Sequence, residues 1–150
     1  MISTSDIDNP PDIKLGGLSL WVEGRERPED EDFWDGNWLL IRAKVEAHNS
    51  YVGVSGPWLR TDEIASFLNQ LDIMSNTVKG KAELAPIEPY LKATLEMNAT
   101  GQITARVDAT PDHMSQRHTF HFELDQSFLP EIIRGCRNIL LRFPTKRSQA

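Results

Sequence analysis

The sequence has only one cysteine, Cys136, in 150 residues, so no disulfide can form within the chain. It also lacks any apolar run near the length of about 20 residues that a membrane-spanning helix needs. Residues 1–12 contain acids and prolines, but neither the basic nor the apolar segment of a signal peptide. We therefore expect a cytoplasmic protein with no membrane partner, beginning with a flexible arm over residues 1–12.

Basic residues are in the minority. The chain has 16 lysines and arginines against 22 acids, which gives a net charge of -6. Phosphate contacts require clustered lysine and arginine, so we expect no nucleic-acid partner. An acidic protein suits a basic protein partner, although acidity often serves solubility alone. The hydrophobic content of 39% and charged content of 25% are ordinary for one folded domain.

No set of catalytic side chains is recognisable. His118 and His121 fall on opposite faces of an expected strand, while His48 and His113 fall in a turn and a loop, so we favour structural or solvated histidines over a metal site. Cys136 lies on the apolar stripe of an expected helix and is interpreted as a core residue. The glycine and serine segments match neither a phosphate loop nor a nucleophile elbow. We therefore expect no enzyme, no metal and no cofactor.

Hydrophobic periodicity predicts the secondary structure. Alternating apolar residues predict strands near residues 18–22, 38–47, 51–59, 81–86, 91–97, 103–109 and 118–124. Helical spacing follows Thr61 and, later, Asp125 or Ser127. The hairpin-rich order predicts an α+β fold: a single mainly antiparallel β-sheet of about six to seven strands, with two helices packed on its apolar face. This single domain would span residues 13–144, followed by a frayed basic tail over residues 145–150.

Two local features can be predicted in more detail. Thr61 is a good N-cap for the first helix, with Asp62 and Glu63 beside the positive helix end. In the later hairpin, Met97 must oppose Ile103 if both apolar rows are to share a face. That register puts Gly101 in the left-handed position of the turn, which glycine adopts without strain. It also pairs Lys92 with Asp108, and Thr94 with Arg106, on a polar outer face.

The most unusual segment is a loop over residues 24–36. Its acids and one of its tryptophans form the candidate partner-binding site: Glu29, Asp30, Glu31, Asp32, Trp34 and Asp35. Charge steers the encounter with a basic partner and an aromatic ring can anchor it. The alternative is a solvated loop in which Trp34 or Trp38 folds back into the core. Trp38 begins a strand, which favours a core position for that residue. A structureless loop of about a dozen residues is near the length at which function is the usual cause.

The turns, strand starts and helix caps of the chain resemble those of a known family. The segments that carry the resemblance, in order, are Asp35-Gly36-Asn37-Trp38-Leu39, Leu59-Arg60-Thr61-Asp62-Glu63, Glu88-Pro89, Gly101-Gln102-Ile103 and Asp125-Gln126-Ser127-Phe128-Leu129. Their order and spacing over about residues 13–144 resemble the WapI-like bacterial immunity proteins, and the D-x-N-W-L element is the most specific part. The resemblance implies a small cytoplasmic antidote that blocks a cognate toxin domain, often a nuclease, by binding rather than catalysis. It implies no catalytic or cofactor residues, and the matching motif residues can all be explained as caps and turn-formers.

Two other functions remain open at this point. The chain could be a structural protein that associates with itself through a sheet edge or the outer face of the sheet. A pocket between helix and sheet could instead bind a small molecule, although no acid, base and nucleophile set supports an enzyme. The antidote hypothesis predicts a monomer or weak dimer, with a basic toxin domain bound at the acidic segment.

Overall fold

The computed structural model describes residues 9–148, so most of the expected N-terminal arm lies outside the described residues. The first half of the described chain contains four strands and a helix: β1 (Ile13–Leu15), β2 (Leu18–Arg25), β3 (Trp38–Ala47), β4 (Ser50–Arg60) and α2 (Thr61–Thr77). The second half repeats this order with β5 (Gly80–Leu84), β6 (Leu91–Met97), β7 (Gln102–Ala109), β8 (His118–Asp125), the 3-10 helix η1 (Gln126–Phe128) and α3 (Leu129–Arg142). The α+β class is therefore confirmed.

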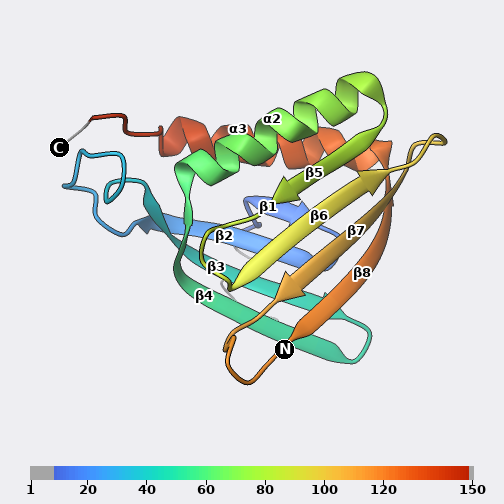
Figure 1. Cartoon of the computed structure of the whole chain (residues 1–150), viewed down its shortest axis with the longest axis horizontal. Coiled ribbons are helices and arrows are strands. Elements are labelled where there is room, and N and C mark those ends of the chain that lie inside the picture. Colours follow the sequence, from blue (N-terminus) through green and yellow to red (C-terminus); the bar gives the residue numbers. More distant parts are fainter. Residues whose placement is uncertain (1–8, 149–150) are drawn as a thin grey trace.

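The expectation of a single sheet is wrong. The described strands form two antiparallel sheets of four, in the orders β1-β2-β3-β4 and β5-β6-β7-β8. In Figure 1 the strands of the two sheets cross, and α2 and α3 lie together along one side of them. Alternation along a strand identifies its buried face but not its neighbours, so a strand with one buried face fits one wide sheet or two packed sheets equally well.

Both sheets and both helices contribute to one hydrophobic core. Its buried side chains include Leu20 of β2, Val107 of β7, Phe67 of α2 and Ile139 of α3. Cys136 of α3 is fully buried as expected, and this burial raises the pKa of its thiol to about 12. Among residues 9–148, no helix is both long enough and apolar enough to span a membrane.

The register of the β6–β7 hairpin is confirmed. Met97 pairs with Ile103, Lys92 with Asp108 and Thr94 with Arg106. Gly101 has a φ of +84° in the connecting turn, a conformation that a residue with a Cβ rarely adopts. In this hairpin the short connection and the two apolar rows are enough to fix the pairing.

Close contacts of backbone and side chains join the two halves of the chain. The ring of Phe122 in β8 packs on the β1–β2 turn, where a Cβ added to Gly17 would lie 2.7 Å from it. In α3, a Cβ added to Gly135 would lie 2.1 Å from the backbone oxygen of Asp12. The ion pair between Arg137 of α3 and Asp72 of α2, at 3.1 Å, links the two helices. Glycine is therefore required where α3 packs on the segment that leads into β1.

Replacing Gly135 by alanine should lower the free energy of unfolding by about 1–3 kcal/mol, because the new methyl group collides with backbone. Helix propensity alone would give the opposite sign, a gain of about 1 kcal/mol. Urea unfolding measures the difference, with Asn138→Ala on the exposed face of α3 as the control. A Gly135→Ala variant more stable than the parent would contradict this close packing.

Candidate functional site

The segment between β2 and β3, here called the acidic loop (residues 26–37), projects from one end of the molecule (Figure 1). A backbone hydrogen bond from Glu26 N to Trp38 O, at 3.0 Å, closes its base. Within the loop, the N–H of Gly36 donates to Asp32 O at 3.0 Å. A Cβ on Gly36 would lie 2.4 Å from Asp30 O, so the loop crosses itself where only glycine fits. The acidic loop therefore has a defined and compact conformation.

Asn37 is fully buried and fixes the end of the acidic loop. Its side-chain N–H groups donate to Phe33 O at 2.8 Å and Lys146 O at 2.9 Å, and its Oδ1 accepts from the backbone N–H of Lys146 at 2.8 Å. The backbone oxygen of Asn37 accepts from the N–H of Thr61, the first residue of α2. One side chain therefore joins the loop to the C-terminal segment, which explains the asparagine of the D-x-N-W-L element.

Arg60 at the end of β4 is the second anchor, and its side chain is also fully buried. Its guanidinium donates to Trp34 O at 2.5 Å, Phe33 O at 2.7 Å and the carboxylate of Asp62 at 2.9 Å. Arg60 also lies about 5 Å from the ring centroids of Phe33, Trp34 and Trp38. Trp38 is half-buried against this cation and does not belong to the hydrophobic core, where the sequence favoured placing it.

The role of Arg60 was missed by the sequence analysis. The only local signals were its place at a strand end and its position before a helix, and neither distinguishes a buried arginine from an exposed one. Three aromatic residues within the preceding loop and strand were the available indirect signal, because arginine often stacks on such rings.

The C-terminal segment, expected to be frayed over residues 145–150, contacts the acidic loop as far as it is described. Lys146 Nζ donates to the backbone oxygens of Pro28 at 2.8 Å and Asp30 at 2.6 Å. The N–H of Phe33 donates to Ser148 O at 2.9 Å. Residues 149–150 lie outside the described part of the chain. The C-terminal segment therefore supplies backbone and ammonium groups that hold the backbone of the acidic loop in place.

The six predicted site residues lie on the outer side of this framework. Trp34 is 65% exposed although its backbone oxygen is held by Arg60. Among the acids, Glu29, Glu31 and Asp35 are exposed, whereas Asp30 and Asp32 are half-buried. The carboxylates of Glu29 and Asp35 make no hydrogen bond or ion pair with any other residue in 9–148. The loop therefore presents one large ring and two exposed carboxylates, Glu29 and Asp35, that have no partner within residues 9–148.

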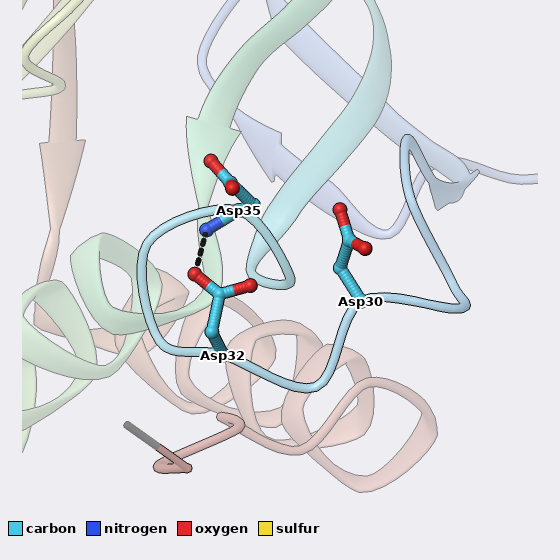
Figure 2. A group of neighbouring side chains, drawn as sticks. All are labelled: Asp30, Asp32 and Asp35. Carbon is cyan, nitrogen blue, oxygen red and sulfur yellow. Dashed lines mark hydrogen bonds between the residues drawn. The ribbon is translucent and has the colours of Figure 1, made fainter. Parts of the chain in front are cut away.

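Three of these carboxylates converge. One oxygen each from Asp30, Asp32 and Asp35 lies within 4.8 Å of the others. Figure 2 shows the Asp32 carboxylate accepting the backbone N–H of Asp35, at 2.9 Å. Exposed acids often gather in this way without an ion, so the cluster by itself does not define a metal site. Like charges at this spacing repel, and a cationic side chain from outside would relieve the repulsion.

The beginning of α2 differs from the expected cap. The N-cap is Arg60 and not Thr61, because the Glu63 carboxylate accepts the backbone N–H of Arg60 at 2.9 Å. The other oxygen of Glu63 accepts the N–H of Ile87 at 2.7 Å. Burial raises the pKa of Glu63, and these two hydrogen bonds oppose the shift. Thr61 is buried within the helix, with its hydroxyl unpaired among the described residues.

Replacing Asn37 by alanine should lower the free energy of unfolding by about 2–4 kcal/mol, because the part-buried N–H and carbonyl of Lys146 lose their side-chain partner and Phe33 O keeps only its hydrogen bond from Arg60. Urea unfolding measures the loss, and Asn69→Ala on the exposed side of α2 is the matched control. An unchanged stability would mean that the loop does not depend on this side chain.

Comparison with known proteins gives one family match. The model of the immunity protein WapI-like family matches residues 12–144. No curated protein matches the chain. Among solved structures, the chain is similar to a chain of the CdiA-CT/CdiI toxin and immunity complex from Enterobacter cloacae, with 12% identity, a TM-score of 0.45, and coverage of 81% of this chain and 99% of that chain.

Two other solved structures are similar to a comparable degree. A chain of MRP1/MRP2 from Trypanosoma bruciei has 14% identity and a TM-score of 0.43, with 89% of this chain and 90% of that chain covered. The plant transcriptional regulator PBF-2 has 13% identity and a TM-score of 0.44, with 87% and 79% covered. Similarities this low carry no argument about function, whereas the family model covers nearly the whole described chain and confirms the resemblance drawn from the motifs. The chain belongs to the WapI-like immunity protein family.

Proposed function

We propose that this protein is an antidote that neutralises a cognate toxin domain in the cytoplasm by binding it, without catalysis, through the acidic loop. The observation that carries the proposal is an anchored loop that exposes Trp34 and a group of acids, in a chain of the immunity protein family. The proposed contact residues are Glu29, Asp30, Glu31, Asp32, Trp34 and Asp35.

The anchoring of the loop favours tight binding. A loop that must order itself on binding loses affinity, because each immobilised side chain costs about 0.5–1.5 kcal/mol. Here Asn37 and Arg60 already hold the backbone of Phe33 and Trp34. The loop is therefore preorganised in the free protein, and binding does not have to offset the entropy of ordering it.

The negative charge of the acidic loop favours a basic partner. Several carboxylates close together attract a basic surface over several ångströms and speed its association. A toxin that cleaves RNA or DNA needs a basic cleft for its substrate, and an acidic antidote covering that cleft would exclude the substrate. We therefore propose a basic toxin domain as the partner, a nuclease as its class, and no nucleic acid bound by this protein itself.

Reversing the charges of Glu29 and Asp35 to lysine should slow association with the toxin domain encoded beside this chain by about 10-fold or more at low salt, with a smaller effect at high salt. Neither carboxylate bonds to another described residue, so the loop should keep its conformation. Stopped-flow or surface-binding kinetics at two salt concentrations measure the rates.

The matched control reverses Glu96 and Glu123, two exposed acids on the outer face of the second sheet, which changes the net charge by the same amount. Equal slowing by both pairs would show a general effect of net charge and would count against a site at the loop.

Removing the ring of Trp34 by substitution with alanine should weaken toxin binding by about 10- to 100-fold, because an exposed aromatic at the centre of an interface is a typical anchor. The control is Tyr51→Ala, an aromatic side chain of similar exposure, 62% against 65%, in the β3–β4 hairpin. Calorimetric titration measures both affinities. If the toxin binds the Trp34→Ala and parent proteins equally, the contact surface lies elsewhere.

A further inference from the structure

A second large apolar side chain is exposed in a connection that is hydrogen-bonded to the start of α2. Ile87, in the connection between β5 and β6, is 69% exposed. Figure 1 shows the N-terminal end of α2 between this connection and the acidic loop. Glu88-Pro89, one of the segments that carry the resemblance to the family, follows Ile87 immediately, but the sequence alone gave no reason to connect this turn with the start of α2.

Hydrogen bonds tie the two exposed side chains to one framework. The guanidinium of Arg60 holds the backbone of Trp34, and the backbone N–H of Arg60 donates to Glu63 at 2.9 Å. The second oxygen of Glu63 accepts the N–H of Ile87 at 2.7 Å. Arg60 and Glu63, at the start of α2, therefore hold both the acidic loop and the β5–β6 connection. A surface fixed in this way loses little entropy when a partner binds.

The exposed acids of this surface come mainly from the acidic loop, at Glu29, Glu31 and Asp35. Asp62, one-third exposed at the start of α2, lies beside Arg60, whose own charge is buried. Of the basic groups in the adjoining segments, Lys146 is mostly buried against loop carbonyls and Arg27 is 3.8 Å from Asp30, which leaves Arg147 as the exposed cation in that segment. A basic protein surface with an apolar side chain of its own fits this arrangement, because its cations would meet acids and its apolar group would meet Ile87.

We propose that the toxin-binding surface extends from Trp34 across the N-terminal end of α2 to Ile87, and that one basic toxin domain occupies both contacts together. This inference rests on the proposed function and adds a second anchor to it. Glu63 acts as a positioning residue, since it is half-buried and would hold Ile87 in place without touching the toxin.

The first test is Ile87→Ala, assayed by calorimetric titration against the toxin domain encoded beside this chain. Removal of the exposed side chain should raise the Kd about 5- to 10-fold, with no change in thermal stability. The matched control is Ile73→Ala, which truncates an isoleucine that is 55% exposed on α2, near the opposite end of that helix. The control should leave the Kd within about twofold of the parent.

The second test is Glu63→Gln, which leaves one side-chain oxygen to serve two backbone donors. The Kd should rise severalfold in the parent, but less in the Ile87→Ala background, because part of the effect of Glu63 passes through Ile87 and the rest through Arg60. Equal increases in both backgrounds would overturn the positioning role. Thermal unfolding of each variant identifies any loss of fold, and Ile87→Ala, at an exposed site, tests the second anchor independently of this risk.

The outcomes separate the two proposals. If the toxin binds and Trp34→Ala weakens it while Ile87→Ala does not, the second anchor is wrong and the proposed function stands. If the folded and active toxin domain does not bind the parent protein at all, both proposals are wrong for that pair.

Discussion

The buried guanidinium of Arg60 is the interaction on which the rest of this end of the molecule depends. A cation taken out of water must have its donors satisfied, because an uncompensated buried charge costs several kcal/mol. Arg60 meets this requirement with two loop carbonyls and one carboxylate, and three aromatic rings surround it. Satisfying that charge therefore requires β4, the start of α2 and the acidic loop to come together in one arrangement.

The same arrangement separates what holds the loop from what the loop presents. The anchoring contacts are mainly to backbone carbonyls and to the buried side chain of Asn37, on the inner side. Among the acids, Glu29 and Asp35 have exposed carboxylates without a partner in residues 9–148, whereas Asp30, Asp32 and Glu31 make contacts with Arg27, the Asp35 backbone and Lys146. Their mutual repulsion would destabilise a loop that depended on them, but this loop depends on other groups. Changes in the outward side chains could therefore alter the partner without altering the fold.

Much of the secondary structure could be predicted from the sequence because it depends on local pattern. The alternation of Leu91–Met97 and Gln102–Ala109 fixed the hairpin register to the residue, and the spacing of Ile64, Phe67 and Leu71 identified α2. The division into two sheets could not be predicted, because alternation does not specify which strands pair. The contacts of Asn37 with Lys146 could not be predicted either, because they join residues that are 109 positions apart in the sequence. The acids and Trp34 were identified by composition, but only the long-range contacts explain why they form a defined surface.

The dependence of the acidic loop on Lys146 and Ser148 has a consequence for the newly made chain. A ribosome adding about 5–20 residues per second completes the loop some 5–20 s before it reaches the residues that fasten the loop from behind. During that interval the first sheet can form, but the loop lacks its final supports. The surface proposed here for toxin recognition would thus be among the last parts of the molecule to reach its final conformation. An incomplete chain would contain the acidic residues but not the contacts that fix their positions.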